Sequence, residues 1–244
     1  MNVRSDRRPR RLLALALLLA LLALVVPATA EAQQAEADIL VAHAILAYDA
    51  GRYAEALDLL RQALAHEPDH VEALYYAGLA HLALQQPEAA LAPLERAHGL
   101  APADLAVQLQ LGVASFVLKR DAQAERLLGR VFAEQPKTDG VGYYLGVVRY
   151  RRRDYRGALE AFRGGTSSDP EIQQLTRLYT GLTLAALGRR EQALSEVDAA
   201  LRLPSTSAVT SAAERLRDAV LTARAPVRPL QAEVRLGVYY DTNV

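Results

Sequence analysis

The sequence predicts an all-α protein built as a solenoid, in which about five pairs of antiparallel helices stack in a row. Three observations support this fold class. Small and bulky apolar residues recur at fixed distances along most of the chain. Alanine and leucine supply most of the apolar content, whereas the chain has only 3 Phe and no Trp, a composition that favours closely packed helices. Four prolines follow one another at a spacing of 34 residues: Pro68, Pro102, Pro136 and Pro170.

The first 30 residues have the pattern of a secretory signal peptide. Five Arg and one Asp lie within residues 1–11, and residues 12–26 are an unbroken run of 15 apolar residues. Small residues then place cleavage after Ala30 or after Ala32 equally well. An uncleaved anchor is the alternative, but 15 helical residues span roughly 22 Å, less than the ~30 Å hydrocarbon core. We expect a Sec-type signal, with a twin-arginine route left open by the paired arginines, and a destination in the periplasm or outer membrane.

Residues 31–205 contain the repeated unit. A small residue lies 24 positions before each proline, an alanine lies 12 before it, and a bulky apolar residue lies eight before it. A fifth unit has the same pattern shifted by one residue. One helix pair cannot bury its apolar face alone, so neighbouring units must cover it. The residues that define the repeat are Gly78, Gly112, Gly146 and Gly181, the alanines Ala56, Ala90, Ala124, Ala158 and Ala193, and the prolines Pro68, Pro102, Pro136 and Pro170.

This pattern resembles the tetratricopeptide repeat family, whose 34-residue unit is a helix–turn–helix with small residues at positions 8 and 20, a bulky residue at 24 and proline near 32. The resemblance covers roughly residues 36–205. The sequence lacks the family's aromatic residue at position 11, and Val131 and Gly165 replace the alanine of position 27 in the third and fourth units. We therefore expect the later units to pack less regularly.

The resemblance also implies a binding surface. In the family, the first helix of each pair lines a concave face, where positions 2, 5, 9 and 12 point inward; in this sequence positions 5, 9 and 12 are mostly apolar or aromatic. Such a surface is typical of sites that bind other proteins. We predict that an extended or helical segment of a protein partner lies there; the alternative is that the rings only fill core. The predicted partner-binding residues are Tyr48, Tyr75, Phe116, Tyr143, Tyr150 and Arg151.

No pattern for catalysis, a cofactor, a metal or nucleic acid is found in the sequence. The formal net charge is zero, so there is no basic footprint for nucleic acid, and there is no Cys. His66 and His70 lie four residues apart, but Pro68 separates them and no further ligand joins them. The chain has only two Lys and two Asn, at positions where the carboxylate clamp of the family's chaperone-tail binders cannot be built. We therefore predict no enzyme, no cofactor and no metal.

Two segments follow the array. Residues 206–224 predict an amphipathic helix that caps the stack. Residues 225–244 comprise a linker and a strand, because apolar and polar residues alternate from Leu230 to Tyr240 over a length that suits a transmembrane β-strand. The strand resembles the start of outer-membrane β-barrels that carry a tetratricopeptide domain, such as surface lipoprotein assembly modifiers and some polysaccharide exporters. Since only a closed barrel satisfies its backbone in lipid, we expect either a longer natural protein or a tail that pairs elsewhere.

Taken together, these features predict an exported protein–protein interaction scaffold, a periplasmic domain that serves an outer-membrane export or assembly system. The alternative is a free periplasmic adaptor that organises a cell-envelope complex. The first function predicts outer-membrane association through the C-terminal strand, and the second predicts release with the soluble periplasm. The sequence carries no signal for the oligomeric state.

Overall fold

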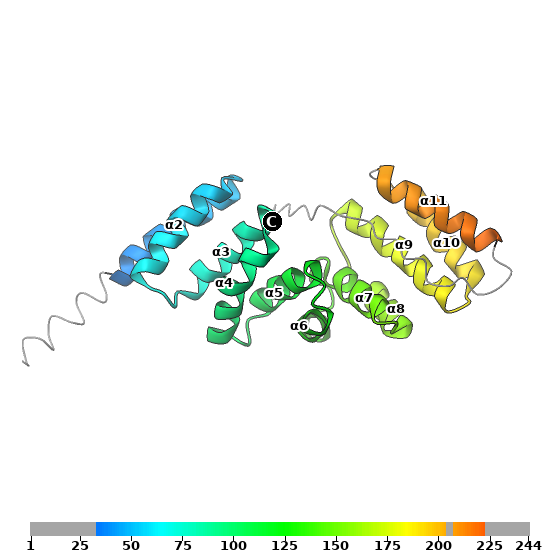
Figure 1. The fold of residues 1–244 in the computed structure, drawn as a ribbon, viewed down its shortest axis with the longest axis horizontal. Coiled ribbons are helices and arrows are strands. Elements are labelled where there is room, and N and C mark those ends of the chain that lie inside the picture. Colours follow the sequence, from blue (N-terminus) through cyan, green and yellow to red (C-terminus); the bar gives the residue numbers. More distant parts are fainter. Residues whose placement is uncertain (1–32, 204–206, 223–244) are drawn as a thin grey trace, which may run out of the picture.

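The computed structural model describes residues 33–203 and 207–222, and within these ranges the chain folds into eleven helices (Figure 1). This confirms the predicted all-α helical solenoid. In the described ranges there is no strand, and the β-bridge seen there joins Asp139 to Thr166. The first helix covers residues 33–49, followed by α2 (Tyr53–His66), α3 (Val71–Ala83), α4 (Pro87–Leu100), α5 (Leu105–Val117), α6 (Asp121–Glu134), α7 (Val141–Arg151), α8 (Tyr155–Gly164), α9 (Pro170–Ala186), α10 (Arg190–Leu201) and α11 (Ser207–Thr222).

Consecutive helices pack in pairs, and the pairs stack into a curved row. The first helix shares a core with α2, then α3 packs on α4, α5 on α6, α7 on α8 and α9 on α10. Helix α11 closes the row against α10 and α9. Figure 1 shows that α3, α5, α7 and α9 lie toward the inner side of the curve, with α4, α6 and α8 toward the outer side.

Within a pair, the small residue of the first helix meets the bulky residue of the second. A Cβ atom built on Gly78 would lie 2.4 Å from Cγ of Leu94, and one built on Gly146 would lie 2.3 Å from Cε1 of Phe162. Carbon atoms in ordinary contact are about 3.5–4.0 Å apart, so the two helices approach this closely because the side chain is absent. The same contact joins Gly112 to Leu128 and Gly181 to Val197.

The other recurrent residues fall at corresponding places in each unit. The alanines of the second helices, from Ala56 to Ala193, are all fully buried. Pro68, Pro102 and Pro136 lie in the loops between units. Pro170 instead begins α9, where the N–H that proline lacks would have no partner within the helix.

The turn inside each pair holds one residue in the left-handed region. Two of these residues are glycines, Gly51 with φ 73° and Gly188 with φ 75°. Gln85, Lys119 and Arg153 hold the same place in the middle units, with φ of 58°, 57° and 65°. Each of the five donates its N–H to the carbonyl three residues earlier, which ends the first helix of the pair.

The fourth unit departs from the regular pattern. Helix α8 has 10 residues, whereas α2, α4 and α6 have 14 each. It ends where a Cβ on Gly142 would lie 2.6 Å from Cα of Gly165. The chain beyond is tied to the loop before α7, since Asp139 accepts hydrogen bonds from the Ser168 amide at 2.7 Å and from its hydroxyl at 3.0 Å.

Of the segments predicted at the two ends of the chain, the structure describes only the capping helix. The predicted signal peptide (1–30) and the predicted strand (225–244) lie outside the described residues. In α11, Ala212, Leu216 and Val220 are buried at the four-residue spacing seen in the sequence. None of the described helices is both long enough and apolar enough to cross a membrane.

Candidate protein-binding surface

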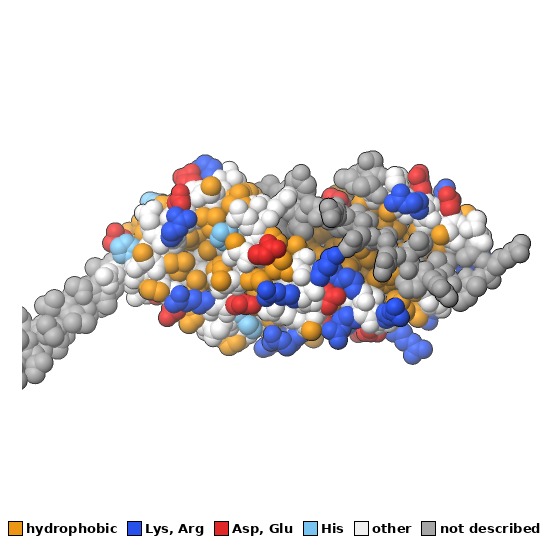
Figure 2. Space-filling model, in the orientation of Figure 1, with side chains coloured by type: hydrophobic (Ala, Val, Ile, Leu, Met, Phe, Trp, Pro, Cys, Tyr) orange, Lys and Arg blue, Asp and Glu red, His pale blue; other side chains and the backbone are white. Residues whose placement is uncertain are grey.

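The six predicted binding residues come from the first helices of three units and from the first helix of the chain. Tyr75 on α3, Phe116 on α5 and Tyr150 on α7 are half-buried, so each keeps part of its ring accessible. Leu109 lies on the same helix as Phe116, seven positions earlier, and is half-buried as well. Tyr75, Leu109, Phe116 and Tyr150 are called the inner row below. Figure 2 shows hydrophobic side chains across the middle of the molecule, flanked by charged groups.

Two of the predicted rings offer almost no surface to a partner. Tyr48 is 3% exposed and Tyr143 is 4% exposed. Rings from neighbouring helices pack against both residues. Tyr143 lies 6.2 Å from both Phe116 and Tyr179, measured between ring centroids. Both tyrosines lie in the core in this structure, as in the alternative that the sequence left open, and their contact with a partner stays a prediction.

Three further tyrosines connect the predicted rings. Tyr76 lies 5.7 Å from Tyr48 and 5.4 Å from Tyr75, and Tyr179 lies 5.7 Å from Tyr150. Tyr144 lies 5.2 Å from Tyr143 in the same edge-to-face manner, a geometry that adds to the stabilisation from burial alone. Sequence reasoning missed this set, although a signal exists, since each of the three tyrosines stands two residues before the small residue of its unit.

Arg151 does not present a free charge. Its Nη2 atom lies 2.5 Å from Oδ1 of Asp121 on α6 and 3.3 Å from the carbonyl oxygen of Phe116, to both of which it donates. Its guanidinium carbon sits 4.6 Å from the centre of the Phe116 ring, a cation–π distance. Arg151 therefore links α7 to the preceding unit, and its role in partner binding stays a prediction.

The tyrosines of the inner row are neutral at physiological pH. Burial, followed by the neighbouring phenols of Tyr76 and Tyr48, raises the pKa of Tyr75 to about 12. Burial, followed by Tyr155 and Tyr179, raises the pKa of Tyr150 to about 12 as well. Since Arg151 is paired, the inner row is an uncharged surface of rings and aliphatic carbon, which suits apolar side chains of a partner.

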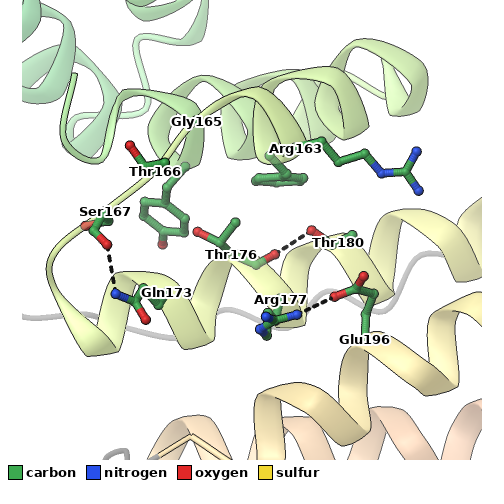
Figure 3. A pocket seen from close by; sticks show the side chains of 11 residues that line it. Arg163, Gly165, Thr166, Ser167, Gln173, Thr176, Arg177, Thr180 and Glu196 are labelled. Atoms are coloured by element: carbon green, nitrogen blue, oxygen red, sulfur yellow. Dashed lines mark hydrogen bonds and ion pairs between the residues drawn. The ribbon is translucent and has the colours of Figure 1, made fainter. Parts of the chain in front are cut away.

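A cavity of about 380 Å³ lies between the end of α8, the loop 165–169, α9 and α10, with Tyr143 of α7 in its wall (Figure 3). Arg163 and Gly165, at the end of the short helix α8, form part of its wall. Its polar groups are largely engaged with each other: Gln173 donates to the carbonyl of Ser167 at 2.8 Å, and Arg177 donates to Glu196 at 3.2 Å.

Comparison with known proteins places the fold. Residues 41–104 match the family model of the tetratricopeptide repeat, and no curated protein sequence matches the chain. A variant of MamA is 24% identical with a TM-score of 0.59, covering 70% of this chain and 97% of its own. YrrB, described as a tetratricopeptide protein with an unusual peptide-binding site, is 18% identical (TM-score 0.60; 72% and 90%). The pilF protein of Pseudomonas aeruginosa is 17% identical (TM-score 0.60; 77% and 85%).

Proposed function

We propose, from the tetratricopeptide-repeat fold of the described chain, that this protein is an interaction scaffold that holds a segment of another protein along the inner side of its helix stack. The observation that carries the proposal is the inner row, whose residues stay accessible in three successive units. Aromatic side chains at such positions provide large contact areas and dominate binding energies. The likeness to YrrB, described as having a peptide-binding site, supports a peptide as the ligand class.

The chemistry of the row defines the expected partner. Because the tyrosines are neutral and Arg151 is paired with Asp121, the row attracts no particular charge. We therefore expect an extended or helical segment with apolar side chains, rather than an acidic tail. Such a segment would be bound chiefly through burial of apolar area, so its affinity should depend little on salt.

The test compares two variants of the purified protein. Replacing both Tyr75→Ala and Tyr150→Ala removes two half-buried rings of the row, and because both rings also pack against the core, the helicity of the variant is measured alongside. Leu100→Ala is the matched control, since Leu100 is 43% exposed on the outer helix α4. Proteins of the producing cell's envelope that the native chain retains should be lost with the double variant and kept with the control. The proposal fails if the double variant keeps its helicity and binds the same proteins with the same affinity.

We further propose that the scaffold acts in the periplasm for an outer-membrane export or assembly system. The support is the signal-like pattern of residues 1–30 and the alternation from Leu230 to Tyr240. The natural gene product should be processed after Ala30 or Ala32, sediment with outer membranes and migrate differently after heating. Release with the soluble periplasm would instead support a free adaptor of an envelope complex, and retention of residues 1–30 in the cytoplasm would contradict both.

A further inference from the structure

The first and second units meet at a cluster of side chains that can bind a metal. Asp38 belongs to the first helix, Glu67 to the loop after α2, and His70 to the position that caps the start of α3. One ligand atom from each lies within 4.8 Å of the other two. The stacking of the two units brings these residues together, since 32 positions separate Asp38 from His70.

Glu67 has an unsatisfied oxygen in this cluster. Its Oε2 atom is buried and accepts no hydrogen bond from the part of the chain that the structure describes. A buried carboxylate oxygen without a donor is destabilising, and the nearby carboxylate of Asp38 adds repulsion between like charges. A bound divalent cation would satisfy the oxygen and neutralise both carboxylates.

The imidazole of His70 is held in a defined orientation. Its Nδ1 accepts the Ala73 amide hydrogen at 3.3 Å, so in the neutral ring Nε2 carries the proton and donates to Oδ1 of Asp38 at 3.0 Å. Two ligands of a tetrahedral zinc ion lie about 3.3 Å apart, given metal–ligand bonds of about 2.0–2.1 Å. The two atoms are therefore already near the separation that a shared metal ion requires.

We propose that Asp38, Glu67 and His70 form a binding site for a divalent transition metal of the zinc class. One imidazole nitrogen with two carboxylates is a mixed donor set that zinc accepts, whereas magnesium and calcium prefer oxygen ligands alone. Binding replaces the proton on Nε2 of His70, which moves to Nδ1, so the Ala73 amide loses its acceptor. The sequence drew attention to His66 and His70 together, but His66 lies 3.8 Å from Glu36, outside this cluster.

The site is tested by titrating the purified full chain with Zn²⁺ in a calorimeter and by following thermal unfolding. We expect one equivalent to bind at this cluster, the unfolding temperature to rise, and the Ala73 amide signal to shift in a nuclear magnetic resonance spectrum. Mg²⁺ should produce none of these effects. Asp38→Asn should weaken Zn²⁺ binding by about tenfold or more, and it leaves the cap of α3 in place.

His70→Gln should lose the same binding, and His81→Gln is the matched control because His81 lies at the other end of α3 and contacts Gln86. His81→Gln should bind Zn²⁺ as the native chain does. The proposal is overturned if the folded native chain takes up no Zn²⁺. It is also overturned if Asp38→Asn binds Zn²⁺ as tightly as the native chain, since the ion would then sit at other surface histidines.

Discussion

The contact between α7 and α8 allows a quantitative test of how the units hold together. In Gly146→Ala, the new Cβ would lie 2.3 Å and 2.4 Å from Cε1 and Cδ1 of Phe162. Restoring an ordinary separation of about 3.5–4.0 Å requires the ring to retreat by more than about 1 Å. Phe162 is only 5% exposed and its ring centroid lies 6.3 Å from that of Tyr179, but the ring also lines the cavity between α8 and α9, which can take up part of this movement.

The expected magnitude follows from two opposing effects. Overpacking of a core site costs about 1–3 kcal/mol, and a ring that can shift toward a cavity belongs in the middle of this range. Alanine in place of a helical glycine regains about 1 kcal/mol through backbone entropy. We therefore expect Gly146→Ala to lower the free energy of unfolding by about 1 kcal/mol, measured by urea denaturation followed by circular dichroism.

Two further variants separate crowding from the effect of alanine itself. Gly129 on α6 has no atom within 4 Å of where its Cβ would lie, so Gly129→Ala should raise stability by about 1 kcal/mol. Adding Phe162→Leu to Gly146→Ala recreates the pairing of the first unit, where Ala44 and Leu60 share one buried core cluster. The double variant should lose less stability than the sum of the single ones. If Gly146→Ala is as stable as the native chain, the close approach does not hold the pair and the reasoning is wrong.

Three other perturbations test contacts between units and the buried phenols. Arg151→Met removes the pairing with Asp121 and should lower stability by about 1 kcal/mol in urea denaturation, by less at high salt. Asp139→Ala removes both hydrogen bonds from Ser168 and should lower the thermal unfolding temperature by an amount equivalent to about 1 kcal/mol. The pKa of Tyr75 is raised from 10.0 to about 12 in the folded chain, so the phenol loses its proton at a lower pH in the unfolded chain than in the folded one. Stability should therefore fall between those pH values, by at most about 1.4 kcal/mol per pH unit for this group; an urea midpoint independent of pH there would contradict the assignment.

The regular part of the fold was predictable from sequence because its packing rule is local and strict. A glycine such as Gly78 and a leucine such as Leu94 must stand 16 residues apart for one helix to close on the next. The early end of α8 was not predictable in the same way. It depends on the close backbone approach of Gly165 to Gly142 and on the hydrogen bonds that Ser168 donates to Asp139, and these contacts join residues more than 20 positions apart.

The binding surface was predictable in outline only. Position within the repeat indicates which side of a helix a residue occupies, and Tyr75, Phe116 and Tyr150 are half-buried in the structure. It does not indicate what the neighbouring unit packs against that side. Tyr143 is covered because Phe116 and Tyr179 come from the units before and after it, and Arg151 is held because Asp121 stands 30 residues earlier.

Replacing the non-glycine residues in the left-handed turns by glycine should stabilise the array. Gln85 and Arg153 hold a backbone conformation that costs an L-residue roughly 1–2 kcal/mol relative to glycine. Glycine relieves this cost, but its greater freedom in the unfolded chain offsets part of the stabilisation. Gln85→Gly and Arg153→Gly should therefore each raise the free energy of unfolding by about 0.5–1 kcal/mol. The two turns are far apart and share no contacts, so the gains should add. The free energy of unfolding of the stack could thus be raised by separate substitutions in the turns between paired helices, with the inner row unaltered.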